Sequence, residues 1–248
     1  VMTCSTFRHP AHLAIIVAQV DAMSGGRIEL GIGAGSSPAE HAALGIQLDD
    51  IGTRFDRVEE QLELIKAIWS TPLDEDLDFD GAHYRLEGYP ARVELSQSQS
   101  PSPPIIIGGH GPKRTPRLAA RFADEFNIDW LTPEQAAAAY ERVDRACEAV
   151  GRDPKDLARS ISLVLCCATS DRELERRLEA TRCGMGEDEE DAIDVGAVGS
   201  PQQVVDCLGE FSEVGVSRVY LEVYDMTDLD QLALVGQEVL PHLVAPGN

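Results

Sequence analysis

The chain has 248 residues, 43% of them hydrophobic, so it is long enough to bury a sizeable core. Its 43 acidic and 21 basic side chains give a formal net charge of −22 at pH 7. A field of that sign repels nucleic-acid phosphates and anionic lipid, although a solvated acidic surface alone also explains the charge. No apolar run approaches the ~18 residues of a membrane span, and no signal peptide is apparent. We therefore expect a cytoplasmic protein that binds neither nucleic acid nor membrane.

The cysteines are scattered along the chain without a C-x-x-C pair. They are Cys4, Cys147, Cys166, Cys167, Cys183 and Cys207. This spacing predicts neither a zinc site nor a disulfide framework, and no metal is expected. The cysteines are interpreted as small apolar residues in a reducing compartment.

In chain order, the first strand-like pattern covers Val1–Cys4, and a helix is expected over His9–Met23. The apolar residues of that helix recur at helical spacing and predict one buried stripe, made of Leu13, Ile16, Val17, Val20 and Met23. A strand is expected over Arg27–Gly33 and runs into a loop. The clearest amphipathic helix of the protein follows over Arg54–Trp69.

The second half of the chain continues the alternation of strands and helices. Residues 70–103 are interpreted as irregular and 183–199 as an acidic loop, both insertions. Further strands are expected over residues 103–108, 125–128, 160–168 and 218–223, and further helices over 115–123, 134–150, 171–182, 201–214 and 229–243. Strands that alternate with helices predict a parallel sheet covered by helices. Both a doubly wound sheet and a (β/α)8 barrel fit this pattern.

The first glycine-rich turn follows the strand that ends near Gly33. Its glycines, Gly31, Gly33 and Gly35, only partly match the dinucleotide-binding fingerprint, because Ser36 stands where that fingerprint has its third glycine. The long helix begins only near Arg54, whereas the fingerprint opens a helix at once. A tight turn between strand and loop is therefore favoured over a Rossmann site.

The second glycine-rich turn is a stronger signal for ligand binding. A branched-aliphatic run ends at Gly108, Gly109 and Gly111, and a helix begins soon after. Bare backbone amides at a strand end, next to a helix N-terminus, are typical of a phosphate-binding site. Lys113 and Arg114 would add positive charge or lie in solvent. A sharp turn between strand and helix is the structural alternative, and a Walker loop is excluded because no Lys-Ser/Thr pair follows the glycines.

Several motifs, in this order, resemble the luciferase-like monooxygenase superfamily. Within it, they resemble the actinobacterial oxidoreductases that depend on the deazaflavin coenzyme F-420 (F420). The motifs lie at Met2–Pro10, Ser24–Gly35, Arg54–Trp69, Pro103–Asn127 and Gly199–Val223. The resemblance spans nearly the whole chain and implies an α/β fold of (β/α)8 TIM-barrel type. It also implies one domain over residues 1–248, a small-molecule substrate and a homodimer.

The resemblance further implies that the cofactor binds at the carboxyl ends of the strands. Its phosphate would lie on the loop Gly108–Gly111, while a bulge with a non-proline cis peptide at Cys4-Ser5 would support the deazaflavin ring. The cofactor-binding residues expected on this basis are Cys4, Ser5, Gly33, Ala34, Gly108, Gly109, His110 and Gly111. His9 matches the Arg-His-Pro motif of the family, although a locally hydrogen-bonded histidine at a helix start explains it equally well.

Two departures from the family pattern limit these expectations. Two βα units precede the first strand in the family, so this chain looks N-terminally truncated to about six βα units. Ser36 and Ser37 also stand where some relatives have a glutamate, and no catalytic acid or base is assigned. Hydride transfer between F420 and an unknown organic substrate is expected. The alternatives are an FMN-dependent monooxygenase and a non-catalytic remnant.

Overall fold

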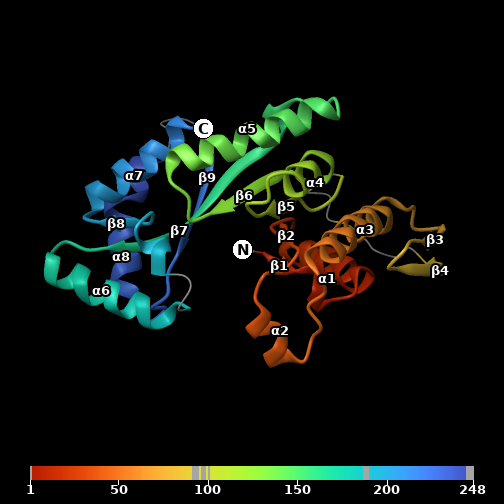
Figure 1. Ribbon diagram of the computed structural model, residues 1–248, viewed down its shortest axis with the longest axis horizontal. Coiled ribbons are helices and arrows are strands. Elements are labelled where there is room, and N and C mark those ends of the chain that lie inside the picture. The colour runs from red at the N-terminus through yellow and green to blue at the C-terminus, as the bar shows by residue number, and fades with distance from the viewer. Residues whose placement is uncertain (1, 91–94, 96–98, 100, 187–189, 244–248) are drawn as a thin grey trace. The chain divides into compact units, whose positions relative to one another are not determined.

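The structure is a computed structural model that describes residues 2–90, 95, 99, 101–186 and 190–243 (Figure 1). The internal contacts of the chain divide it into two compact units. Unit 1 comprises Val1–Phe126 and Val143–Leu157, and unit 2 comprises Asn127–Arg142 and Ala158–Asn248. The expectation of a single domain over residues 1–248 remains a prediction.

Three parallel strands form the centre of unit 1. In the order in which they pair, they are β1 (Thr3–Cys4), β2 (Leu30–Gly33) and β5 (Ile105–Gly108). Cys4 pairs with Gly33, and Ile32 pairs with Ile107. The branched side chains of β2 and β5 are buried, as in a parallel sheet covered on both faces. Because the strands are parallel, their carboxyl ends meet at one edge of the sheet.

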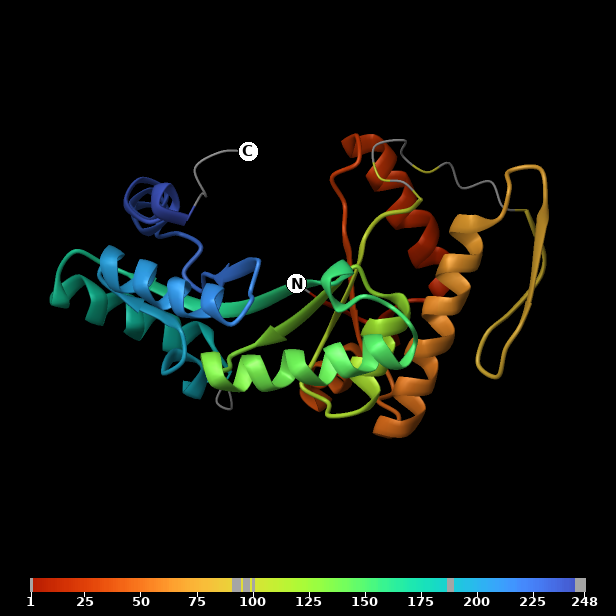
Figure 2. The same cartoon turned by 90° about the horizontal axis from the view of Figure 1, so that it is seen from above.

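Helices surround these strands in unit 1. They are α1 (Pro10–Ser24), α2 (Pro38–Leu44), α3 (Ile51–Ser70) and α4 (Arg114–Phe122), with a short 3-10 turn, η1, over Ser5–Phe7. Helices α1 and α3 lie side by side (Figures 1 and 2). The buried Trp69 indole of α3 donates to the Ala14 carbonyl of α1 at 3.1 Å, so the two helices are joined by a hydrogen bond as well as by apolar packing.

Side-chain caps explain where the helices of unit 1 begin and end. The Asp50 carboxylate accepts hydrogen bonds from the amides of Gly52 and Thr53, and this cap starts α3 three residues before the expected Arg54. Helix α1 ends at Gly25, which has a φ of +72° and donates its amide to the last turn. The expected end of α1 at the Ser-Gly-Gly motif is thereby confirmed.

Parts of unit 1 differ from the sequence-based expectations. The loop after Gly35 contains α2, and the segment expected to be irregular contains a hairpin of two antiparallel strands, β3 (Asp76–Asp80) and β4 (Arg85–Pro90). The prediction that all apolar residues of the α1 stripe are buried is wrong. The apolar surface of the helix is wider than the face that packs against the protein. Leu13 and Val17 are buried, whereas the exposed apolar residues are Ile16, Val20 and Met23.

Unit 2 is built around β7 (Ala158–Cys167), whose residues from Ile161 onward are buried. This strand pairs in parallel with β8 (Ala197–Gly199) and with β9 (Arg218–Glu222). Its helices are α6 (Asp171–Gly184), α7 (Pro201–Glu213), α8 (Leu229–Glu238) and α9 (Leu240–Leu243), with a short turn, η3, at Glu190–Ile193. The segment expected to be an acidic loop over 183–199 therefore ends in a strand, and residues 187–189 of it lie outside the described residues.

Strand β6 (Glu125–Asp129) begins in unit 1 and ends in unit 2. Helix α5 (Pro133–Ala149) begins in unit 2 and ends in unit 1. A 3-10 turn, η2 (Pro154–Asp156), precedes β7. All six cysteines lie within the described residues and are free thiols. Among the helices of the described ranges, none is both long and apolar enough to cross a membrane.

Candidate functional site

The expected cofactor-binding residues of unit 1 gather where β1, β2 and β5 end. Cys4 and Gly33 are register partners, and Gly108 ends the next strand. The Met2 side chain joins these ends, because a Cβ on Gly108 would lie 2.9 Å from the Met2 Cε atom and one on Gly33 would lie 4.0 Å from its Cβ. The structure thus brings together segments that lie about a hundred residues apart in the sequence.

The residues Gly108–Gly111, here called the glycine corner, leave β5 and lead toward α4. Gly109 has a φ of +127°, which residues other than glycine rarely adopt. A Cβ on Gly111 would lie 2.7 Å from the Thr115 hydroxyl oxygen. Steric limits therefore require glycine at two of the three expected positions. His110, between them, is exposed.

Backbone donors of the glycine corner are available to a ligand. Within the described part of the chain, no acceptor pairs with the Gly109 or Gly111 amide. Helix α4 begins just beyond with Lys113 as its N-cap, and no side chain caps its first amides. Uncapped amides and the positive end of the helix dipole both favour an anion.

The loop after β2 lies next to Cys4. A Cβ on Gly35, whose φ is +80°, would lie 3.4 Å from the Cys4 sulfur. Burial raises the pKa of the Cys4 thiol, and the negative charge of Glu40 adds to the rise, while Arg54 and a backbone hydrogen bond from Ser36 oppose it. The raised pKa disfavours the thiolate form at pH 7 and with it nucleophilic chemistry at Cys4. Arg54 also donates a hydrogen bond to the Gly35 carbonyl.

Ser5 and Ala34 complete the expected cofactor-binding set. Ser5 is only 2% exposed, and its hydroxyl has no hydrogen-bond partner among the described residues. Ser5 therefore contributes backbone rather than a solvent-facing hydroxyl to the strand ends. Ala34 is half-buried in the loop between Gly33 and Gly35.

The structure favours local roles for two further residues of the sequence analysis. His9 is the N-cap of α1, and its Nδ1 atom accepts a hydrogen bond from the Ala11 amide at 3.3 Å. Arg114 donates to the Gly52 carbonyl at 3.0 Å and to the Asp56 carboxylate. Arg114 is therefore held by α3 and does not add charge to the glycine corner, whereas Lys113 is exposed.

The comparison with known families decides the assignment of the chain. Residues 1–218 match the family model described as luciferase-like monooxygenase. The chain belongs to the luciferase-like monooxygenase family. It is 35% identical over 126 residues to an F420-dependent glucose-6-phosphate dehydrogenase of Nakamurella multipartita. That match covers 51% of this chain and 34% of that enzyme, so the matched segment spans about a third of the enzyme's length.

Comparison with solved structures shows the fold of this chain. An F420-dependent secondary alcohol dehydrogenase in complex with an F420-acetone adduct has a TM-score of 0.77 and 17% identity, covering 98% of this chain and 78% of that one. The oxygenating constituent of 3,6-diketocamphane monooxygenase from Pseudomonas putida, in complex with FMN, has a TM-score of 0.72 and 22% identity, covering 100% of this chain and 79% of that one. These likenesses confirm the α/β, luciferase-like barrel type. The expected truncation to about six βα units remains a prediction.

The residues present at the strand ends of this luciferase-like chain fit the anionic tail of a flavin-type cofactor. The amides of Gly109 and Gly111, for which the described residues provide no acceptor, can donate to a ligand, and the Thr115 hydroxyl lies beside them. Added Cβ atoms at Gly108 and Gly111 would meet the side chains of Met2 and Thr115, so these two side chains pack against the glycine backbone. Thr115 is 2% exposed and lies in the first turn of α4; sequence reasoning assigned it no role, although it lies only four residues after Gly111.

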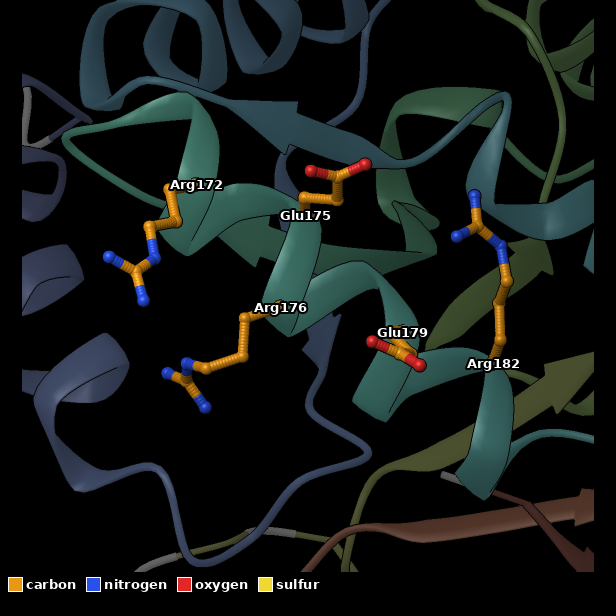
Figure 3. A pocket seen from close by; sticks show the side chains of 5 residues that line it. All are labelled: Arg172, Glu175, Arg176, Glu179 and Arg182. Atoms are coloured by element: carbon orange, nitrogen blue, oxygen red, sulfur yellow. The ribbon is translucent and has the colours of Figure 1, made fainter.

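Two surface pockets elsewhere carry no assignment. One lies in unit 2 along α6, where five charged side chains line it: Arg172, Glu175, Arg176, Glu179 and Arg182 (Figure 3). All five come from a single helix, and the described residues bring no second element to the pocket. The other lies in unit 1 between α3 and the β3–β4 hairpin and is lined mainly by carboxylates. Within the described residues, no group of three or more His, Cys, Asp or Glu side chains is arranged to hold a metal ion.

Proposed function

We propose that this chain is an F420-dependent oxidoreductase that transfers a hydride to or from a small organic substrate. The observation that carries the proposal is the glycine corner at the carboxyl ends of β1, β2 and β5. Two of its amides have no acceptor among the described residues, and the Lys113 side chain does not cap the helix that follows. Phosphate sites of barrel enzymes lie at this end of the strands. F420-dependent dehydrogenases among the relatives support the choice of cofactor.

In this proposal the chain binds and orients the cofactor. The amides of Gly109 and Gly111 and the Thr115 hydroxyl bind the phosphate, and the positive end of α4 adds to the attraction. Cys4 and Gly33 lie beside the ring as neutral groups. When bound, F420 supplies or accepts the hydride, and the protein contributes orientation and exclusion of water. We assign no general acid or base, and we propose a cytoplasmic homodimer.

FMN is the second candidate cofactor, because a solved relative of similar fold binds it and its phosphate fits the same corner. The distinguishing experiment titrates the purified chain with F420 and with FMN in parallel and follows cofactor fluorescence. We expect F420 to bind and FMN to bind at least about tenfold more weakly, which corresponds to ~1.4 kcal/mol. Tight binding of FMN alone would overturn the deazaflavin assignment, and binding of neither would favour a non-catalytic remnant.

A substitution in the glycine corner tests where the cofactor binds. In Gly111→Ala, the added Cβ would displace Thr115 and obstruct the corner. Loss of a charge-assisted hydrogen bond there is expected to raise the dissociation constant about tenfold to a hundredfold. Gly209→Ala is the matched control, because a Cβ at that position of α7 meets nothing within 4 Å. Equal affinities of the two variants would contradict the proposed location.

A further inference from the structure

Two adjacent polar residues of α3, Glu60 and Gln61, are buried in unit 1. Glu60 is 9% exposed and Gln61 is 0% exposed, on a helix whose other buried residues are apolar. Burial of polar groups on such a face is costly unless they are hydrogen-bonded. The partners of these two side chains therefore indicate what the polar residues are for.

Glu60 binds the turn of the β3–β4 hairpin. Its carboxylate accepts hydrogen bonds from three successive backbone amides, those of Ala82, His83 and Tyr84, at 2.7–3.1 Å. A Cβ on Gly81 would lie 1.9 Å from a Glu60 carboxylate oxygen, so only glycine fits there. Figures 1 and 2 show the hairpin beside α3. This contact fixes the position of Tyr84.

Gln61 joins Tyr84 to the candidate cofactor site. Its Nε2 group donates one hydrogen bond to the Tyr84 hydroxyl at 2.7 Å and another to the Ser5 carbonyl at 2.8 Å. Both amide hydrogens of Gln61 are thereby used. The His9 ring, just beyond Ser5, packs edge-on against the Tyr84 ring with the centroids 5.5 Å apart.

The hydrogen bonds that Gln61 and Ser5 make and lack show which contact requires an amide side chain at position 61. In the part of the chain that the structure describes, neither Gln61 Oε1 nor the Ser5 hydroxyl has a hydrogen-bond partner, although both are buried and belong to the two residues that the carbonyl contact joins. An apolar side chain at position 61 would avoid the cost of that unpaired amide oxygen. What only an amide provides is a pair of donors in fixed geometry, one of them directed at the Ser5 backbone.

We propose that Gln61 and Tyr84 are positioning residues of the cofactor site, which act by fixing the Ser5 carbonyl and with it the peptide between Ser5 and Thr6. The inference rests on the proposed function, because Ser5 directly follows Cys4, the strand end where the cofactor ring would bind. In this view the hairpin is part of the site without touching the cofactor. Tyr84 orients Gln61, and Gln61 orients the backbone.

The experiment compares Gln61→Leu and Tyr84→Phe with the wild-type chain. Gln61→Leu removes both donors, and Tyr84→Phe removes one acceptor while Gln61 still reaches Ser5. Tyr89→Phe is the matched control, because Tyr89 lies on the same hairpin and no hydrogen bond of its hydroxyl is found in the described structure. Three quantities are measured: the F420 dissociation constant, the absorption spectrum of bound F420, and the backbone amide shifts of Ser5 and Thr6 in the free chain.

We expect Gln61→Leu to raise the dissociation constant about tenfold, as for loss of one hydrogen bond, and to change the spectrum of bound F420. Tyr84→Phe should act in the same direction but less strongly, and Tyr89→Phe should change nothing. In the free chain, the amides of Ser5 and Thr6 should shift in Gln61→Leu and Tyr84→Phe. Unchanged affinity and spectrum, or a loss of binding that only follows the unfolded fraction seen by circular dichroism, would overturn the inference.

The amide shifts separate this inference from the proposed function. If the wild-type chain bound neither F420 nor FMN, the proposed function would fail, and the shifts would still decide whether Gln61 positions Ser5. Shifts confined to the hairpin would then overturn the inference, and shifts that reach Ser5 and Thr6 would support it.

Discussion

The His41 ring of α2 determines how the backbone just after β1 is held. Its Nδ1 lies 2.7 Å from the Ser37 carbonyl, which can only accept, so Nδ1 carries the proton. Nε2 is then the acceptor for the Thr6 hydroxyl, also at 2.7 Å. His41 is 1% exposed and packs against Phe7, with the ring centroids 5.0 Å apart.

This arrangement predicts the effect of removing the Thr6 hydroxyl. Thr6→Val leaves the buried Nε2 of His41 without a donor, which should lower the free energy of unfolding by about 1–3 kcal/mol. Thr6→Ser keeps the donor and should restore most of that stability. Urea unfolding of both variants measures the difference. Equal stabilities of the valine and serine variants would show that the hydrogen bond does not stabilise this turn.

Single residues of the site could be predicted only where the local sequence forces a conformation. The glycine corner was predicted because glycines after an aliphatic run require a special backbone, and Gly109 has the positive φ that this reasoning implies. Thr6 and His41 could not be paired from the sequence, because they lie 35 residues apart and meet only after α2 has folded. That the residues of the expected set bind the cofactor remains a prediction.

Whole elements were predicted well when they were long and periodic. The apolar spacing of α3 and the continuous apolar run of β7 both match the structure. Helix α2 has only seven residues and β8 only three, too few for a period to be visible. The β3 strand was missed although its sequence, Asp-Leu-Asp-Phe-Asp, alternates strictly, because the flanking acidic and Ser/Pro-rich segments favoured an irregular interpretation.

A buried ion pair joins α6 to the start of α8 in unit 2. Arg177, 3% exposed, donates to the Asp228 carboxylate at 2.8 and 3.0 Å and to the Cys167 carbonyl at 2.5 Å. The hydrogen bonds from Arg177 hold the pKa of Asp228 well below its usual range, against the opposing effect of burial. The folded state therefore keeps Asp228 ionised in moderately acidic solution.

The lowered pKa of Asp228 predicts the sign of a pH effect. A carboxyl whose pKa falls on folding contributes stability that is fully present above its unfolded pKa of about 4 and is lost as the pH decreases below it. Asp228→Asn should lower the free energy of unfolding by about 3–5 kcal/mol at pH 7, because it leaves Arg177 buried and unpaired. Denaturant curves from pH 7 to pH 2.5 measure both effects. The difference between wild type and variant should shrink toward pH 2.5; a constant difference would contradict the assigned ion pair.

At the scale of the whole chain, the net charge of −22 is the dominant property. Excess like charge destabilises a compact state through self-repulsion, and salt screens that repulsion. The melting temperature should therefore rise by a few degrees when the ionic strength increases from about 0.01 M to 0.15 M. Differential scanning calorimetry at fixed pH measures this rise. A fall in the melting temperature would mean that the stabilisation by exposed ion pairs, such as those between Glu59 and the arginines of α4, is larger than the repulsion between like charges.

The central claim is that backbone amides of the glycine corner bind the anionic tail of F420. The most direct measurement is a titration of the 15N-labelled chain with F420, in which the amide signals of Gly109 and Gly111 are followed. The account predicts that these two signals show the largest downfield proton shifts and that they saturate together with the fluorescence change. Saturable binding of F420 that leaves both signals in place would contradict it.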